Sequence, residues 1–504
     1  MENITELVSI INKRKLSQIE ILDKSLISRK DTLFAKFYNG IAEGHIKTDR
    51  DAVLYIYGSN KDATNYRKLK SRFKERLLNT LYFIDINHAA ETDSSKKAYF
   101  DCLNHLYLSN ILLRYAESRN ASIQLIADSY ATAKRNNFFD ILKEYSYKLL
   151  VHYGMSGQIR KYEEEYASYQ QYCKEYELEQ KAQLIYTKAM MTVHYAKKNQ
   201  EDKEKEIKQC TEEIASFIAE AKSLVVYFIY IRTLLFYYEI SGNNKKINET
   251  CDTYLKHYRK YLSSILSENY LNTIYIYKLK SLFDLRKMEE ALSLIKEIVP
   301  TSGGASYLAV REFEMKLLLS GMKTDKARET LHQIQTNANY KNANAALKER
   351  WVVYQAYLEF LEHYMNDGNY KFSLSKFANE IPLVSQDKSG FNLAARILHI
   401  LFHIGRNDLD NAMQHIESLR VYQARHLKDD SNTRSLLFIR LLTTMEKKSF
   451  NYKELHQLKE YQALKENYST QIMHESEIIF YDVIWKMLVD VIRKNDQKLI
   501  RTLR

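Results

Sequence analysis

Basic residues gather on one short stretch of the sequence, at a spacing that places several of them in a row. Lys68, Arg72 and Arg76 follow one another at four-residue steps, which makes them neighbours on a helix surface. Like charges at this spacing destabilise a helix by about 0.2–0.5 kcal/mol per pair, so a compensating anion is expected. The candidate nucleic-acid-binding residues are Lys61, Arg67, Lys68, Lys70, Arg72, Lys74 and Arg76.

This basic stretch has three interpretations that the sequence leaves open. It binds nucleic acid through residues 61–76, it is a solvated helix face, or it docks on an acidic patch of the same chain. The whole chain has a formal net charge of +12 and an isoelectric point of about 9.0. Such a balance permits an anionic partner without requiring one.

Tyrosine is the unusual residue of the composition, with 40 copies in 504 residues. A tyrosine ring packs between helices while its hydroxyl stays near water or a polar partner, so most copies are expected to be structural. Those on the more apolar helices can instead line a groove, because aromatic side chains bury much area at little cost in entropy. The candidate groove residues are Tyr230, Tyr237, Tyr275 and Tyr277.

Residue patterns that carry enzyme chemistry do not occur in the sequence. It has no phosphate-binding P-loop, no dinucleotide-binding glycine pattern, no HExxH and no GxSxG. His399 and His403 lie four residues apart, with His415 on the next expected helix. No further ligand accompanies them, so a packing role is predicted rather than a metal site. We expect no metal, no cofactor and no enzymatic activity.

The elements that carry these residues are helices that need neighbours. The segment 224–238 is apolar on every side except at Arg232 and Thr233. A turn at 241–244 follows, and then a segment whose apolar residues recur at steps of three and four. The first helix must be covered on several sides, and the second on one side only. The pair predicts an inner and an outer helix, which close a core only when copies of the pair stack.

Similar pairs succeed one another from about residue 97 to 495, so the fold class predicted is all-α. Only 2 prolines and 12 glycines interrupt the chain. A possible hinge is expected at 300–306, and the final helix, about Ser476 to Arg493, is expected to cap the array. Turns between inner and outer helices are predicted about 40 residues apart, near Gly157, Asn199, Gly242, Arg286, Gly321, Gly368, Gly405 and Lys448.

Residues 1–90 depart from this pattern and are predicted to form a small helical N-terminal domain. Thr48 and Asp51 are spaced like a capping box, which starts a short helix that ends at Gly58. A longer helix then spans Asn65–Leu81 and carries the basic residues. Its inward stripe is expected to be Tyr66, Leu69, Phe73, Leu77 and Leu81.

The array resembles the tetratricopeptide-repeat (TPR) superfamily. The best match is the segment 275–298, where Leu282, Ala291 and Ile295 occupy packing positions of that family. Leu279 and Arg286 depart from it, since they replace a small residue and the turn glycine. The resemblance implies an α-α superhelix, a TPR-like solenoid, over residues 97–495. The N-terminal part resembles, more weakly, the winged-helix domains that precede such arrays in some bacterial transcription regulators, although only residues 82–87 remain for a wing strand.

Two functions follow from these expectations. The first is a non-enzymatic scaffold that binds a protein or peptide in the concave groove of the array. The second is a DNA-binding transcriptional regulator that uses residues 61–76 and a partner-binding array. We expect a cytoplasmic protein, because the four cysteines form no CxxC and the N-terminus has no secretory signal pattern. No membrane contact is expected, and the oligomeric state is left open.

Overall fold

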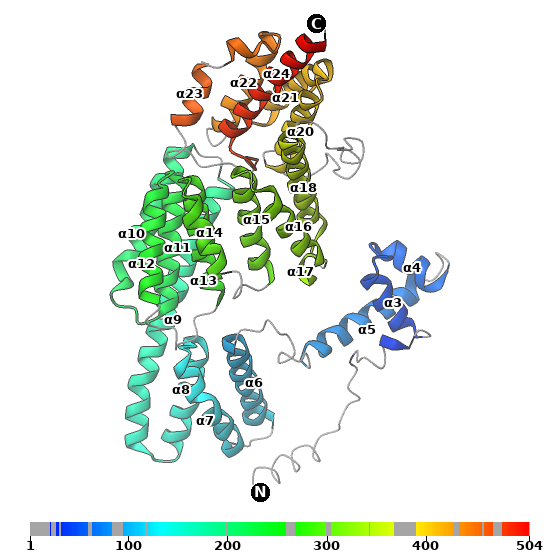
Figure 1. The fold of residues 1–504 in the computed structure, drawn as a ribbon. Coiled ribbons are helices and arrows are strands. Elements are labelled where there is room, and N and C mark those ends of the chain that lie inside the picture. Colours follow the sequence, from blue (N-terminus) through cyan, green and yellow to red (C-terminus); the bar gives the residue numbers. More distant parts are fainter. Residues whose placement is uncertain are drawn as a thin grey trace. The chain divides into compact units, whose positions relative to one another are not determined.

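The computed structural model describes most of the chain as helices. The described residues are 21, 27–29, 32–58, 63–82, 94–115, 119–196, 199–258, 268–298, 304–341, 343–366, 390–427, 433–455, 458–466 and 476–502. None of them lies in a β-strand, so the all-α prediction is confirmed for this part of the chain (Figure 1). The chain divides into two compact units, residues 1–168 and 169–504. We expected a domain boundary between residues 90 and 97. Residues 83–93 lie outside the described part of the chain, so the structure describes only residues 94–97 of this region.

Three short helices form a small core near the N-terminus: α3 (Leu33–Ala42), α4 (Asp49–Tyr57) and α5 (Ala63–Leu81). The predicted capping box is present, since Thr48 accepts a hydrogen bond from the Asp51 amide and Asp51 accepts one from the Thr48 amide. Helix α4 ends at Gly58 in the left-handed conformation, as expected. The core consists of Phe37, Ile46, Ala52, Val53, Ile56, Tyr66, Leu69 and Phe73.

The predicted inward stripe of α5 is correct only for its first half. Tyr66, Leu69 and Phe73 are buried, whereas Leu77 and Leu81 are 38% and 59% exposed. The 19 residues of α5 span about 28 Å, and the 10 residues of α3 span about 15 Å. The shorter helices therefore cover only the first turns of α5.

The remaining helices of the first unit pack in chain order. They are α6 (Ser94–Tyr115), α7 (Arg119–Arg135), α8 (Phe139–Met155) and the beginning of α9 (Ile159–His194). The succession of helix pairs fails at α9, which continues unbroken for 36 residues where an outer and an inner helix were expected. This segment contains neither glycine nor proline, so no residue in it breaks the helical hydrogen bonds.

The second unit continues with α10 (Gln200–Ile218) and then a series of hairpins. Helices α11 (Leu224–Ile240), α13 (Glu268–Asp284), α15 (Gly304–Ser320), α18 (Ala345–Met365) and α20 (Phe391–Gly405) each contact the next helix in this series. We call these five the inner helices. The other helices are α12 (Asn244–Tyr258), α14 (Met288–Ile298), α16 (Thr324–Thr336), α17 (Ala338–Lys341), α21 (Leu409–His426), α22 (Thr433–Lys447), η4 (Tyr452–Glu454), α23 (Lys459–Glu466) and α24 (Tyr481–Thr502).

Six hairpin turns that precede α22 share one backbone geometry, which is the clearest internal repeat in the structure. In each, the second turn residue has a positive φ, and the residue after it donates its N–H to the carbonyl five positions back. This is the Schellman arrangement that ends helices. This geometry confirms the turns predicted near 157, 242, 286, 321 and 405. Gly368 lies outside the described residues. Most of the hinge expected at 300–306 lies outside them too. The positive-φ residues are Asn137, Gly157, Gly242, Arg286, Met322 and Asn407.

The beginning of α24 packs against a hairpin far from it in sequence. The Asp482 carboxylate accepts two hydrogen bonds from the Arg286 guanidinium, which lies in the turn between α13 and α14. The rings of Phe283 and Phe480 lie 4.9 Å apart. Farther along, α24 contacts α20, α22 and α23. The final helix therefore does more than cap the last hairpin, since it joins the middle of the unit to its C-terminal part.

Candidate functional site

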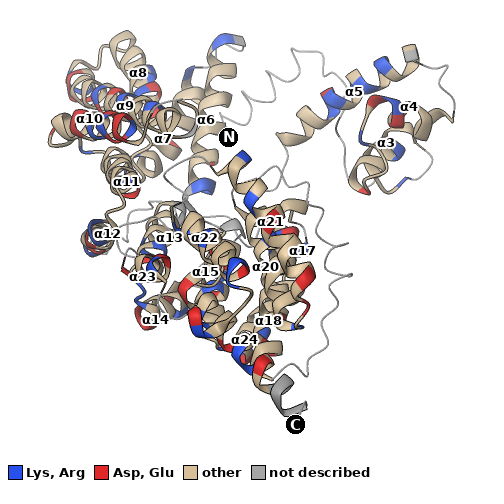
Figure 2. Ribbon diagram, turned by 90° about the horizontal axis from the view of Figure 1, so that it is seen from above, with Lys and Arg blue, Asp and Glu red and all other residues tan. Residues whose placement is uncertain are grey.

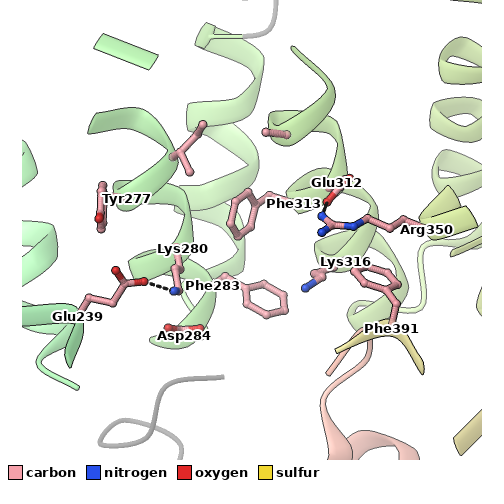
Figure 3. A pocket seen from close by; sticks show the side chains of 12 residues that line it. Glu239, Tyr277, Lys280, Phe283, Asp284, Glu312, Phe313, Lys316, Arg350 and Phe391 are labelled. Carbon is pink, nitrogen blue, oxygen red and sulfur yellow. Dashed lines mark hydrogen bonds and ion pairs between the residues drawn. The ribbon is translucent and has the colours of Figure 1, made fainter. Parts of the chain in front are cut away.

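A pocket with a volume of about 380 Å³ lies among the inner helices of the second unit. Residues of α11, α13, α15, α18 and α20 all contribute to its wall (Figure 3). Helices α13 and α15 each present residues that repeat at steps of three and four, whereas α11, α18 and α20 contribute one residue each. On α13 the repeating residues are Tyr277, Lys280 and Asp284, and on α15 they are Glu312, Phe313 and Lys316.

The aromatic part of the wall comes from three helices. Phe283 of α13 is 3% exposed and Phe391 of α20 is 7% exposed, so both rings are held by packing. Phe313 of α15 is half-buried and packs against the same apolar core as Phe283. Together the three rings form a preformed apolar surface, because little side-chain freedom remains to be lost when a ligand binds.

Charged residues occupy much of the rest of the wall, and two pairs of them are already joined. Lys280 forms an ion pair with Glu239 of α11. The Arg350 guanidinium lies 3.6 Å from a carboxylate oxygen of Glu312 and 5.0 Å from the ring centre of Phe391. These contacts hold both cations in position at the edge of the pocket.

Asp284 is the most deeply buried ionisable group of the pocket. Its side chain is 1% exposed, and its Oδ2 atom has no hydrogen-bond partner among the described residues. Burial raises the pKa of this carboxyl to about 7, Lys280 and Lys316 act to lower the pKa, and Glu477 acts to raise it. A buried oxygen without a hydrogen-bond partner costs free energy. A change in the surroundings of Asp284 should therefore alter the pKa of its carboxyl.

One of the four predicted groove tyrosines lies in this pocket. Tyr277 lines it, and burial first, then the neighbouring Glu239, raises the pKa of its hydroxyl well above the usual value. Tyr230 and Tyr237 instead pack on the core formed by α9, α10 and α11, and Tyr275 packs on the core of α13 and α15. All four are half-buried.

The predicted basic row on α5 is partly engaged within its own small core. The Lys70 ammonium lies 2.6 Å from an oxygen of Asp49, and the Arg76 guanidinium lies 4.0 Å from the ring centre of Phe34. The other basic residues of α5 are exposed, and Figure 2 shows the Lys and Arg positions of the helix in blue. These exposed residues are Arg67, Lys68, Arg72 and Lys74, and Lys61 lies outside the described part.

A second, larger cavity of about 920 Å³ lies beside α24. Both carboxylates of its wall are paired, since Asp482 pairs with Arg286 and Asp490 pairs with Arg493, and Lys465 and Lys486 also line it. Trp485, the largest ring of its wall, is only 1% exposed. We take the inner-helix pocket as the candidate site, because residues of five helices converge on it and the buried Asp284 there keeps an oxygen without a hydrogen-bond partner among the described residues.

The three histidines weighed as metal ligands lie together as stacked rings. The ring centre of His415 is 5.3 Å from that of His399 and 5.0 Å from that of His403. His403 also contacts Asp408, with 2.8 Å between Nδ1 and Oδ2. The described residues contain no group of three potential ligands arranged around a common point.

This stack predicts a loss of stability in mild acid. Burial, then the neighbouring His415 and His403 and Arg396, lowers the pKa of His399 to about 4, and burial also lowers the pKa of His415. The unfolded chain takes up these protons below its ordinary histidine pKa of about 6.5, whereas the folded chain resists them. The contribution of the stack to the free energy of unfolding should therefore fall as the pH drops from 6.5 to 4, by about 1–2 kcal/mol after allowance for partial exposure.

Calorimetric melting of the wild type and of His399→Gln across this pH range tests that expectation. Since glutamine does not titrate, the variant should lose less melting temperature in acid than the wild type. Parallel pH profiles for the two proteins would show that the stack does not contribute.

Sequence reasoning missed most residues of the pocket, because each one is ordinary on its own helix. The signal that was present is the occurrence of charges within otherwise apolar inner helices, at Glu239, Lys280 and Lys316. Such a charge needs a partner or a cavity, since burying it alone is costly. Lys280 and Glu239 pair with each other across two hairpins. Periodicity within one helix does not reveal a partner on another hairpin.

None of the described helices combines the length and the apolar character needed to cross a bilayer. The strongly apolar helix α11 packs on α10, α12 and α13. Comparison with known proteins does not identify a family for this chain. No protein-family model, no curated protein and no solved structure shows significant similarity to this chain.

Proposed function

We propose that this protein is a non-enzymatic scaffold that binds a peptide or a short protein segment in the inner-helix pocket. The resemblance of residues 97–495 to the TPR superfamily supports this proposal, since arrays of that kind use their inner helices for binding. The cytoplasm is the proposed compartment, because the cysteines are unpaired thiols.

The proposal rests on one observation, which is that residues of five helices form the wall of the pocket. A volume of about 380 Å³ falls within the range of ligand sites, and its wall combines apolar rings with a few polar groups. Such a wall suits a ligand side chain together with part of its backbone. The inner helices are also linked to one another by direct packing, so the wall is rigid before the ligand arrives.

Affinity capture with the full chain tests the proposal. Partners recovered by the wild type should be lost with Phe313→Ala, which removes one ring from the pocket wall. Phe100→Ala is the matched control, because Phe100 is 43% exposed on α6 and lies outside the pocket. Circular dichroism of both variants shows whether they keep their helices. Equal recovery by the wild type, Phe313→Ala and Phe100→Ala would contradict binding at this site.

A second candidate function is DNA binding through α5, as in bacterial regulators that combine a helix-turn-helix domain with a helical array. The observation that favours it is the exposure of Arg67, Lys68 and Lys74, for which the structure gives no ion pair among the described residues. Phosphate contacts by such residues release counterions, so binding must weaken as salt rises.

Charge reversal on α5 tests the second function. Lys68→Glu with Arg72→Glu should abolish binding to duplex DNA without loss of helicity. Lys205→Glu with Lys245→Glu gives the same change of net charge on exposed positions of α10 and α12, and it should leave binding nearly intact. If both double variants weaken binding equally, the attraction is a property of overall charge and not of α5.

A further inference from the structure

One side of the hairpin formed by α8 and α9 exposes apolar side chains in two rows. The row on α8 has steps of four residues and the row on α9 has steps of three and four, so each row follows one side of its helix. The six side chains are between 39% and 72% exposed, and all of them belong to the first unit. We call them the α8/α9 face: Tyr147, Val151, Met155, Ile159, Tyr162 and Tyr166.

The two rows lie on the same side of the hairpin. The ring of Tyr162 lies against Gly154, 3.7 Å from the position that a Cβ atom would take there. Val151 of the α8 row lies about 60° around the helix from Gly154. The Lys161 ammonium instead lies over the ring of Tyr153, which marks the other side of the same hairpin. The side chains of the two rows therefore form one continuous apolar surface.

Helix α8 is apolar on two opposite sides, and only one of them is buried. Tyr145 and Leu149 are buried on the side where α8 contacts α6 and α7. The exposed side of α10, by comparison, carries charged residues such as Lys205, Lys208 and Glu212. A helix that is apolar all round is normally covered by neighbours on every side. The α8/α9 face is therefore expected to be covered as well.

The area of this face matches what a stable dimer needs. With about 200 Å² for a fully exposed side chain of this size, the exposed fractions amount to roughly 600 Å². The largest contiguous apolar patch on a typical monomer is about 300–600 Å². A standard interface buries about 800 Å² on each partner, and somewhat more than half of that area is apolar. One copy of the face therefore supplies the whole apolar part of such an interface.

The charges around the face favour an identical partner. Residues 143–166 contain four Lys or Arg and four Glu, so this segment is neutral although the whole chain has a net charge of +12. Arg160 pairs with Glu164 at 3.1 Å, and Lys143 pairs with Glu144 at 3.7 Å. Two copies of the face therefore do not repel each other. Nucleic acid or an anionic membrane would meet no excess of positive charge here.

We propose that this protein forms a twofold symmetric dimer through the α8/α9 face. The hairpins of the two copies pack against each other as a four-helix bundle, in which the apolar rows of one copy contact those of the other. The same six residues serve both copies, since a twofold interface consists of one self-complementary surface. This inference goes beyond the proposed function, because neither the inner-helix pocket nor α5 contributes a residue to the interface.

Light scattering coupled to size-exclusion chromatography of the full chain tests the dimer. The wild type should have twice the chain mass of 59.6 kDa at micromolar concentration. Met155→Arg and Ile159→Arg each place a charge without a partner in the interface, so each should weaken the dimer at least about a hundredfold. Circular dichroism shows whether the variants keep their helices. A monomeric wild type, or variants that remain folded dimers, would overturn the proposal.

Two positions of α9 outside the face provide matched controls. Met191 is 59% exposed and Leu184 is 70% exposed, close to the 63% of Met155 and the 72% of Ile159. Met191→Arg and Leu184→Arg should therefore leave the dimer mass unchanged. Equal weakening by these two variants would overturn the assignment of the interface to the α8/α9 face. Phe313→Ala should also remain a dimer, so a failure of the proposed function and a failure of this inference are distinguishable.

Hydrogen exchange of the wild type provides a readout that needs no substitution. Amides of residues 147–166 should exchange faster once the dimer is diluted below its dissociation constant, whereas those of α21 should not change. Protection of residues 147–166 that does not depend on concentration would mean that another part of the same chain covers the face. A monomeric wild type whose captured partner is lost in Met155→Arg would assign the face to a different protein. Either result would overturn the dimer.

Discussion

Replacing Arg434 with methionine is expected to lower the free energy of unfolding of the second unit by about 3–5 kcal/mol. Arg434 and Glu477 are 2% and 0% exposed, and two hydrogen bonds of 2.8 and 2.7 Å join their side chains. The guanidinium also donates to the carbonyl of Leu464 at 3.0 Å. Without the arginine, the Glu477 charge would stay buried, and among the described residues only the backbone N–H of Tyr481 would donate to it.

The double variant Arg434→Met with Glu477→Leu separates the two causes of this loss. It removes the charge together with its partner, so it should recover much of the stability lost in the single variant. Denaturant unfolding followed by circular dichroism measures each variant. A single variant within about 1 kcal/mol of the wild type would mean that water reaches Glu477 and that the pair is not buried in solution.

Asp284→Asn is expected to raise the free energy of unfolding at pH 8 by about 2–4 kcal/mol. Because the pKa of Asp284 is about 7 in the folded chain and about 3.8 in the unfolded chain, the unfolded chain loses this proton first as the pH rises. The contribution of Asp284 to the free energy of unfolding therefore falls as the pH rises from 3.8 to 7 in the wild type. Asparagine cannot ionise, so the variant escapes this loss.

The sign of the Asp284 effect is testable within one protein preparation. The difference in stability between the variant and the wild type should be small at pH 4.5 and should grow up to about pH 7.5. Asp252→Asn is a suitable control, because Asp252 is exposed and pairs with Lys278. A constant difference from pH 4.5 to pH 8 would show that Asp284 does not titrate in this range.

The local features of the fold were predictable because their causes are local. The capping box at Thr48 and Asp51 depends on residues three apart, and the turns at 157 and 242 depend on glycine in the left-handed conformation. The cause of the unbroken helix α9 is also local, since its residues include neither glycine nor proline. A break was nevertheless expected there, because the predicted repeat of helix pairs required one. Arg286, Met322 and Asn407 hold the left-handed conformation without being glycine, so residue type alone does not identify that position in every turn.

The candidate site was predictable only in part, because it depends on which helices meet. Tyr277 was expected in a groove from its place on an apolar helix, and it lines the pocket. Lys316, Arg350 and Phe391 belong to other hairpins, and no pattern within one helix relates them to Tyr277. The small core around α5 shows the same effect, since Asp49 of α4 engages Lys70 from 21 residues away.

The return of α24 to the turn at Arg286 has a consequence for the order in which the protein matures. The partners Arg286 and Asp482 are separated by 196 residues, so the ring of Phe283 has no Phe480 to cover it until nearly the whole second unit has left the ribosome. During that interval the middle hairpins expose apolar surface that chaperones recognise. Ribosome-stalled chains that end before residue 476 should therefore be cleaved by protease within α13 and α14, and chains that extend through α24 should resist cleavage there.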